Sequence, residues 1–271
     1  MGTAKRERQK AGRQSRRVEA EIAAKKSKRN RNLRNYGIYF AIIVAVVVGI
    51  VIFKGGDNNK STTSTSASTT APTESTAPTG TTVFTYGTTD CPPATGATEQ
   101  KQTFTAPFKQ CIDVTKTYTA LIKTNKGDLT VQLDPIKAPG TVNNFVSLAL
   151  NKYFDGVPCH RIIPDFVVQC GDPTGSGTGG PGYKIPDELP KAGEYKVGSL
   201  AMANSGPNTN GSQFFIITGS QGVALAPSYS LFGQVTAGLD TTLKALDAAG
   251  TTAGVPTKEP VSMTSVTITV S

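Results

Sequence analysis

Residues 159–172, CHRIIPDFVVQCGD, contain most of the side chains in this chain that could do chemistry. The stretch holds the only histidine of the 271 residues, an arginine beside it, a glutamine and two cysteines. Arg161 and Gln169 stand among β-branched and aromatic residues, which favour strands. A fixed cation and an amide in apolar surroundings can bind and polarise a neutral group, but they do not form the proton-transfer pair that hydrolysis commonly uses.

The spacing of this stretch predicts a β-hairpin. If residues 164–166 form its turn, Arg161 lies opposite Gln169. Both side chains then point to the same face as Val167, because side chains alternate along a strand. We therefore predict a site that binds and polarises a neutral peptide, and not a hydrolytic site.

Other catalytic patterns are poorly supported. His160 would have to serve any Ser-His-Asp triad, and the chain has no G-x-S-x-G motif. The four cysteines include no C-x-x-C pair, which argues against a zinc site. Residues 175–180 match the letters of a dinucleotide-binding loop, but Pro181 and Gly182 follow where a helix is needed. We expect no metal and no cofactor, and we interpret His160 as a structural or solvent-facing residue.

Residues 118–271 carry the pattern of a mainly β domain with two helices. A hairpin is predicted at 118–134, around a turn at 125–128. One helix is predicted after Pro139, with Thr141 as its cap, and a second at 239–250. The other predicted strands are the two in 160–170 and those at 200–206, 212–219, 230–235 and 265–271. Many short strands with two helices favour a closed antiparallel barrel.

The N-terminal part separates into a basic and an apolar segment. Residues 1–35 carry thirteen Lys or Arg against three Glu. The excess of positive charge in this segment is larger than the net charge of the whole chain, +9. Residues 36–53 are eighteen uncharged residues, long enough to cross most of a bilayer core. We interpret them as a single-pass transmembrane anchor, the alternative being a cleaved signal peptide. Positive charge stays inside, so the N-terminus is expected in the cytoplasm and the rest outside it.

The remaining segments follow from composition. Residues 54–82 are rich in Ser, Thr and Pro and are predicted to be a disordered linker. Residues 83–117 are predicted to form an irregular, cysteine-containing lead-in. The basic segment 1–35 could bind nucleic acid or anionic lipid, but setting the orientation of the anchor is the simpler interpretation. We expect membrane contact through residues 36–53 and no nucleic-acid partner.

An oxidising compartment and an even number of cysteines predict two disulfides. Four cysteines allow three pairings, and we favour the nearest neighbours, Cys91–Cys111 and Cys159–Cys170. The second bond has a difficulty, because the hairpin register puts Cys159 opposite Gly171. A bulge near Cys170 is therefore expected to bring the two sulfurs together.

Three motifs resemble the cyclophilin-type peptidyl-prolyl isomerases: HRIIPDFVVQCGD at 160–172, MANSGPNTNGSQFF at 202–215 and SLFG at 230–233. The resemblance covers about residues 118–271. It implies an eight-stranded closed barrel capped by two α-helices, and catalytic roles for Arg161, Phe166 and Gln169. It also implies a substrate groove formed by Val167, Ala203, Asn204, Gln213, Phe215, Leu225 and Tyr229, the last at a position where the family often has histidine.

The resemblance implies an isomerase that accelerates rotation of X–Pro bonds, with proline-containing polypeptides as partners. With the predicted anchor, the chain resembles a bacterial, membrane-anchored form of this family. We expect it to act as a monomer on exported proteins at the cell membrane. One alternative is a binding or chaperone module that uses the same groove with little turnover. Another alternative is that the basic segment 1–35 carries the main function and that the domain at 118–271 is only attached to it.

We predict weak cyclosporin binding. Members of the family that bind cyclosporin tightly share a tryptophan beside the proline pocket, but this chain has no tryptophan. Counting back from residues 231–233, the position falls on Ala224. Losing much of ~150–250 Å² of aromatic surface, at roughly 25 cal/mol per Å², costs about two or more orders of magnitude in affinity. Calorimetric titration should give micromolar affinity, and nanomolar affinity would contradict the prediction.

Overall fold

The computed structural model describes residues 84–271, which fall in one compact unit. The basic segment 1–35, the predicted anchor 36–53 and the linker 54–82 lie outside the described residues. Within 84–271, no helix has the length and apolar character needed to span a bilayer. The anchor and its orientation therefore stay predictions.

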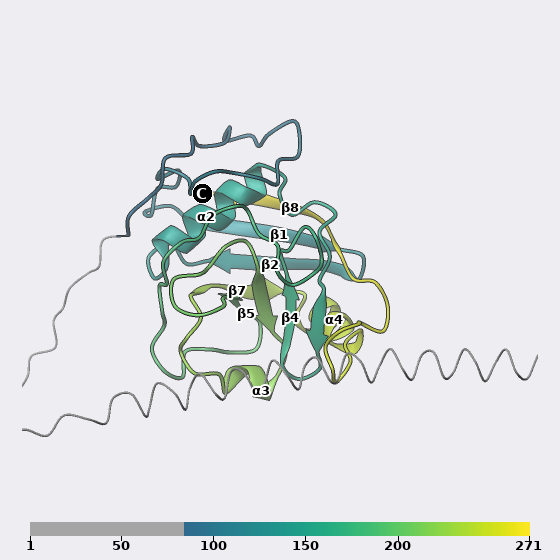
Figure 1. The fold of residues 1–271 in the computed structure, drawn as a ribbon. Coiled ribbons are helices and arrows are strands. Elements are labelled where there is room, and N and C mark those ends of the chain that lie inside the picture. Colours follow the sequence, from purple (N-terminus) through teal and green to yellow (C-terminus); the bar gives the residue numbers. More distant parts are fainter. Residues whose placement is uncertain (1–83) are drawn as a thin grey trace, which may run out of the picture. The chain divides into compact units, whose positions relative to one another are not determined.

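A single antiparallel sheet of eight strands forms the frame of the described unit (Figure 1). The strands are β1 Tyr118–Thr124, β2 Gly127–Leu133, β3 Arg161–Ile163, β4 Val167–Cys170, β5 Ser199–Met202, β6 Phe214–Ile217, β7 Leu231–Ala237 and β8 Met263–Val270. Their order in the sheet is β3-β4-β6-β5-β7-β2-β1-β8. The mainly β, eight-stranded antiparallel architecture is confirmed.

Closure of the barrel is not confirmed. The sheet begins with β3 and ends with β8, and no ladder between these two strands occurs within residues 84–271. One isolated bridge, Pro158 with Ser262, joins the segments that lead into them. The amide of Cys159 donates to Val261 O at 2.9 Å beside that bridge. The two edges therefore meet over a short stretch outside the regular strands, and the arrangement is an open half-barrel.

Both predicted helices are present. The first is α2, Pro139–Leu150. The second begins as a π-helical turn, η1 Leu239–Leu243, and continues as α4 Lys244–Ala248. A short helix that was not predicted, α3 Ser220–Val223, lies in the connection between β6 and β7. It is only four residues long and has too few positions to show a helical period.

The predicted cap of α2 is wrong. The helix begins at Pro139, before Thr141, and makes no cap with its own side chains. Instead, the carboxylate of Glu188 accepts hydrogen bonds from the amides of Gly140 and Thr141 at 2.9 and 2.7 Å, and from the Thr141 hydroxyl at 2.7 Å. A negative group from a distant loop therefore satisfies the free N–H groups at the positive end of the helix dipole.

The lead-in, residues 84–117, winds over α2 as the dark blue segment of Figure 1. Its Phe104, Phe108 and Ile112 are buried in the main core. The side chain of Asn143 on α2 holds it in place, because its Oδ1 accepts from the amides of Cys111 and Ile112 at 2.6 and 3.2 Å. Ten of the twelve residues of α2 are consequently buried.

Apolar side chains pack on both faces of strands β4, β5 and β6. One face belongs to the main core, with Phe214, Ile216 and Val168. The opposite face carries a smaller cluster, called the site cluster here, which consists of Val167, Tyr195, Ala201, Phe215 and Ile217. Because these strands are covered on both sides, their sequences are mostly apolar, as those of buried strands are, with Gln169 of β4 and Ser199 of β5 as the polar exceptions.

Glu188→Ala should destabilise the domain. The substitution leaves two helix N–H groups and one hydroxyl without their acceptor, which typically costs about 1–2 kcal/mol. Urea unfolding should show a lower midpoint with an unchanged slope. Glu99→Ala, at an exposed position of the lead-in, serves as the control and should leave the midpoint in place. An unchanged midpoint for the Glu188 variant would mean that this cap does not stabilise α2.

Candidate active site

The site is a row of residues that runs across four strands. The register pairs Arg161 of β3 with Gln169 of β4, Gln169 with Phe215 of β6, and Phe215 with Ala201 of β5. Directly opposed residues in a sheet point to the same face, so the four side chains form one line. The predicted pairing of Arg161 with Gln169 is confirmed.

Arg161, Gln169 and Phe215 of this row line a pocket of about 230 Å³. The pocket is lined by Arg161, Phe166, Val167, Gln169, Ala203, Asn204, Phe215, Leu225 and Tyr229. The structure therefore brings together nine of the ten site residues that the sequence indicates. Gln213 is the tenth, and it lies in an adjoining pocket. The pocket containing Arg161 is called the first pocket below.

The floor of the first pocket is apolar. Val167 and Phe215 are only 2% and 5% exposed. The ring of Tyr229 stands edge-on to Phe215, with 5.2 Å between the centroids. The hydroxyl of Tyr195 holds the backbone of Tyr229 by donating to its carbonyl at 2.7 Å and accepting from its amide at 3.1 Å. Burial raises the pKa of Tyr195 to about 12, so the hydroxyl that makes these contacts stays protonated.

Arg161 is a half-buried cation at the edge of this floor. Its Nη1 donates to Gln169 Oε1 at 3.2 Å, and its guanidinium carbon lies 5.7 Å from the centre of the Phe166 ring. No carboxylate within residues 84–271 forms an ion pair with it. The charge is therefore held in place by neutral groups and remains uncompensated at the pocket.

The aliphatic part of Arg161 is supported from behind by the loop that follows α4. The amide of Ile162 donates to Gly254 O at 3.0 Å, and the amide of Thr251 donates to Ile162 O at 3.2 Å. Gly254 has φ +77°, and a Cβ there would lie 3.2 Å from Arg161 Cγ. A glycine at this position permits both the left-handed backbone and the close approach of the loop.

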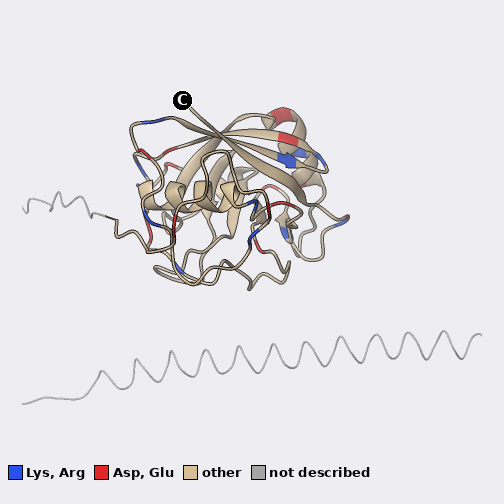
Figure 2. Ribbon diagram, turned by 90° about the horizontal axis from the view of Figure 1, so that it is seen from above, with Lys and Arg blue, Asp and Glu red and all other residues tan. Residues whose placement is uncertain are grey.

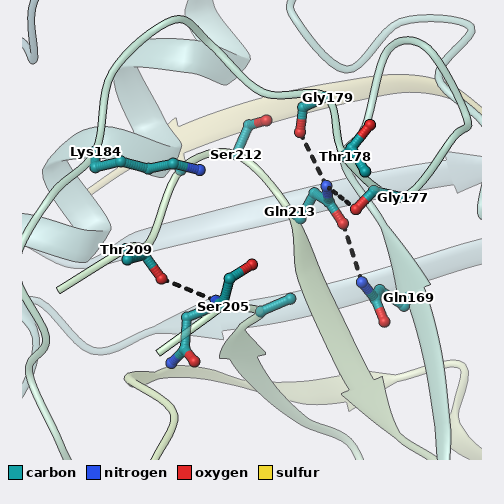
Figure 3. Close-up of a pocket in the computed structure, with 12 residues that line it drawn as sticks. Gln169, Gly177, Thr178, Gly179, Lys184, Ser205, Thr209, Ser212 and Gln213 are labelled. Atoms are coloured by element: carbon teal, nitrogen blue, oxygen red, sulfur yellow. Dashed lines mark hydrogen bonds between the residues drawn. The ribbon is translucent and has the colours of Figure 1, made fainter. Parts of the chain in front are cut away.

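A chain of hydrogen bonds with one direction leads away from Arg161. A guanidinium only donates, so Gln169 presents its oxygen to Arg161 and its Nε2 donates to Gln213 Oε1 at 3.0 Å. Gln213 then donates through its Nε2 to the carbonyls of Gly177 and Gly179, at 3.1 and 2.9 Å (Figure 3). The orientation of both amides is therefore fixed by the cation.

The glycine-rich loop that receives this chain is organised by Asp172. The fully buried carboxylate accepts from the amide and hydroxyl of Thr174, and from the amides of Gly177 and Gly179. Burial opposes ionisation, but the bonds from Thr174, Gly179 and Gly177 outweigh it and lower the pKa of Asp172 to about 2. The element that follows this loop is β5 and not a helix. The loop therefore lacks the strand–loop–helix arrangement of a dinucleotide-binding motif, as the sequence indicated.

A second pocket of about 180 Å³ adjoins the first and shares Gln169, Ala203 and Asn204 with it (Figure 3). Its other lining residues are Gly177, Thr178, Gly179, Lys184, Ser205, Thr209, Gly211, Ser212 and Gln213. Apart from Gln213, none of these nine residues was predicted to belong to a site, although residues 177–179 lie in the rejected dinucleotide motif and residues 205–212 lie in one of the family motifs. They lie on loops without hydrophobic periodicity, so no pattern of spacing indicates that these residues share one pocket.

Asn204 lies where the two pockets join. Its side chain is occupied, because Nδ2 donates to Ser228 O at 3.0 Å and Oδ1 accepts from the Gly206 amide at 3.2 Å. Its backbone N–H and carbonyl, in contrast, form no hydrogen bond with any of residues 84–271. A free donor and acceptor on one residue can pair with an extended peptide as a neighbouring strand would.

Both predicted disulfides are present, Cys91–Cys111 and Cys159–Cys170. The second fixes the base of the site hairpin, since Cys170 directly follows Gln169. The prediction of a bulge near Cys170 is wrong, because the β3–β4 ladder contains no shift of register. The β3–β4 ladder keeps its register and ends at the Arg161–Gln169 pair, so Cys159 lies before β3 and is free of the ladder's constraint.

Residues 119–268 match the model of the family described as cyclophilin type peptidyl-prolyl cis-trans isomerase/CLD. The chain belongs to this family. A "Probable peptidyl-prolyl cis-trans isomerase B" of Mycobacterium tuberculosis is 44% identical over 161 residues, which are 54% of this chain and 51% of that protein. A peptidyl-prolyl cis-trans isomerase B of Streptomyces anulatus is 46% identical over 132 residues, which are 43% of this chain and 75% of that protein. The chain thus spans about half the length of the mycobacterial relative.

Solved structures show the same cyclophilin architecture. A cyclophilin type isomerase of Cryptosporidium parvum has a TM-score of 0.52 and 32% identity, and the match covers 56% of this chain and 98% of that one. The same protein was also solved in the presence of the dipeptide Ala-Pro, with 33% identity and the same coverage.

His160 of the cyclophilin domain lines neither the first nor the second pocket. Its side chain is half-buried, and neither ring nitrogen has a hydrogen-bond partner among residues 84–271. Burial lowers the pKa of the imidazole, which keeps it neutral near pH 7. These features agree with the structural interpretation of His160 and not with a catalytic base.

Asp172→Asn should destabilise the cyclophilin domain by about 2 kcal/mol at pH 7, because the folded state lowers this pKa by nearly two units. A lowered pKa contributes stability above the unfolded value near 4, and the contribution disappears as the pH falls toward 2. The difference between wild type and variant in urea unfolding should therefore shrink over that interval. Asp128→Asn, at an exposed position of β2, is the control. A difference that stays constant down to pH 2 would contradict this role.

Proposed function

We propose that the cyclophilin domain catalyses cis–trans isomerisation of X–Pro bonds in polypeptides. The observation that carries the proposal is an apolar pocket of about 230 Å³ with the uncompensated Arg161 guanidinium at its edge. Val167 and Phe215 offer a surface for a proline ring, while the cation faces the peptide bond before it. The membership of the chain in the isomerase family supports the same reaction.

The chemistry of the bond explains why this arrangement suffices. An amide resists rotation because its nitrogen shares a lone pair with the carbonyl, and the barrier is ~18–20 kcal/mol. For X–Pro bonds both isomers are populated, but uncatalysed exchange takes about tens to hundreds of seconds. In the twisted state the lone pair is localised on nitrogen, where a positive group interacts with it more strongly than in the planar state. Differential stabilisation of this kind accelerates the reaction.

Arg161 is suited to stabilise the twisted amide because it is already in position. Gln169, Phe166 and the loop at Gly254 hold the guanidinium without neutralising it. A charge oriented before the reaction needs no rearrangement when the bond twists. No covalent bond is broken, so the reaction needs no nucleophile or base, which is consistent with the position of His160 outside the pockets.

Peptide binding uses the free backbone of Asn204 and the walls of the first pocket. The N–H and carbonyl of Asn204 pair with the peptide backbone. Phe166, Leu225 and Tyr229 enclose the proline ring, and the Tyr229 hydroxyl offers one further donor. The Ala-Pro dipeptide used with the Cryptosporidium parvum relative supports a ligand of this class.

The location of the activity is part of the proposal. Residues 36–53 anchor the protein in the cell membrane, residues 1–35 stay in the cytoplasm, and the cyclophilin domain acts as a monomer on exported polypeptides. The two disulfides support an oxidising compartment. The alternative function is a tethered peptide-binding or chaperone module with little turnover, for which the same groove would serve.

Arg161→Ala should lower kcat/KM for a proline peptide at least tenfold, because a loss of ~1.4 kcal/mol in the twisted state already has this effect. NMR exchange spectroscopy measures the rate, and circular dichroism checks that the variant is folded. Lys123→Ala removes a cation from an exposed position of β1 and is the control. Wild-type turnover in the Arg161 variant would refute the mechanism. Tight peptide binding without turnover in the wild-type protein would favour the chaperone alternative.

A further inference from the structure

Two walls of the first pocket come from segments that are far apart in the sequence. Phe166 follows the turn between β3 and β4, and Leu225 follows α3, the short helix at the lower edge of the described unit in Figure 1. Neither residue lies in a strand, so the ladders of the sheet do not by themselves fix the distance between them. The contacts that tie these two segments together therefore set the width of the pocket at these walls.

Asp165 joins the two segments. Its carboxylate accepts hydrogen bonds from the Ser220 amide at 2.8 Å, from the Ser220 hydroxyl at 2.9 Å and from Gln221 Nε2 at 3.4 Å. Its backbone carbonyl accepts from the Gln221 amide at 3.1 Å. The helix α3 begins at Ser220 and receives no side-chain bond from its own N-cap residue, Gly219. Asp165 therefore supplies the acceptors that the start of this helix needs.

The turn that carries Asp165 is shaped for this contact. Asp165 has φ +60°, a left-handed conformation that Asp and Asn adopt more readily than other residues with a side chain. Its amide donates to Asp247 Oδ1 of α4 at 2.9 Å, which holds the turn from the other side. On the side of α3, a Cβ on Gly219 would overlap Asp165 Oδ1. The two segments thus approach each other as closely as the backbone allows.

The number of its donors distinguishes Asp165 from other carboxylates on the surface. Red segments, which mark Asp and Glu, lie in several separate parts of the ribbon in Figure 2, and Asp165 is itself exposed. Hydrogen bonds from the side chain and the amide of Ser220 nevertheless lower the pKa of Asp165 below its ordinary value. The carboxylate is therefore ionised at neutral pH, and each of its two oxygens can accept from a separate donor.

We propose that Asp165 is a positioning residue that sets the width of the first pocket between Phe166 and Leu225, and that it thereby makes the pocket selective for the five-membered proline ring. The proposal rests on the proposed function, because it concerns how that site accepts its substrate. A wider pocket would lose contacts with the ring in the planar and the twisted state alike, which raises KM and leaves kcat nearly unchanged. A six-membered ring, as in pipecolic acid, would in contrast be accepted more readily.

The test measures kcat and KM of the full-length chain for two peptides that differ only in proline or pipecolic acid at the isomerised bond. One extra methylene in a fitted apolar pocket changes kcat/KM by about tenfold or more, so the wild-type protein should prefer proline by about this factor. Asp165→Gly removes the carboxylate and still accommodates the left-handed backbone.

Asp165→Gly should raise KM for the proline peptide about three- to tenfold, because the bonds between the two segments are lost. The same variant should lower the preference for proline by about threefold or more. Asp165→Asn keeps one acceptor oxygen and tolerates the same backbone conformation, so its KM and its preference should lie close to those of the wild type.

The opposite side of the contact provides an independent variant. Ser220→Pro removes both the amide and the hydroxyl donor, and proline is favourable at the first position of a helix. It should reproduce the effects of Asp165→Gly. The double variant should show no further change, because both substitutions break the same contact. Asp90→Gly, in the lead-in, where the side chain is 89% exposed, is the control and should leave KM and preference unchanged.

The outcomes that would overturn the proposal are distinguishable. The preference compares two peptides on one protein, so a smaller amount of folded enzyme does not change it. Wild-type KM and preference in both Asp165→Gly and Ser220→Pro would refute the positioning role of Asp165 while leaving the proposed function intact. A lower kcat at unchanged KM and preference would refute it as well. No isomerisation of any peptide by the wild-type protein would refute the proposed function and this inference with it.

Discussion

The directed chain of hydrogen bonds that starts at Arg161 is the interaction on which the site depends. Each amide along it has one orientation, because the guanidinium can only donate and the glycine carbonyls at the other end can only accept. The chain exists only while β3, β4 and β6 keep their register. A slip of one residue would turn Arg161 and Gln169 toward the main core, where an unpaired cation would be strongly unfavourable.

Several neighbouring features preserve that register. The disulfide Cys159–Cys170 closes the base of the hairpin, and the loop at Gly254 supports β3 on its outer side. On the two faces of β4, β5 and β6, the main core and the site cluster exclude water from the strands. A polar row at the edge of an apolar surface is therefore held by packing from both sides, which is how a preorganised site tolerates a half-buried cation.

The parts of the fold that were predictable are those set by local spacing. The Arg161–Gln169 pairing follows from a three-residue turn, and the disulfide partners follow from their separation along the chain. Thr141 shows the opposite case. A threonine near a helix start is a reasonable cap, but Glu188 performs the role from a loop 47 residues away. The positions of Asp172 and Lys184 could not be predicted for the same reason. Their surroundings depend on how separate loops pack together, and no periodic pattern in the sequence indicates that packing.

The two cations that line the pockets, Arg161 and Lys184, lie in different surroundings. Arg161 is half-buried and is held by an amide and an aromatic ring, so the position of its charge is set before a peptide binds. Lys184 is exposed and its amine forms no ion pair among the described residues, so water screens its charge. Under the proposed function, a fixed charge next to the reacting atoms discriminates between planar and twisted amides, whereas an exposed charge one pocket away interacts about equally with both. Equal interaction with both states strengthens binding without lowering the barrier for the bound substrate. Under the proposed function, Arg161 and not Lys184 is therefore the cation placed to lower the rotation barrier.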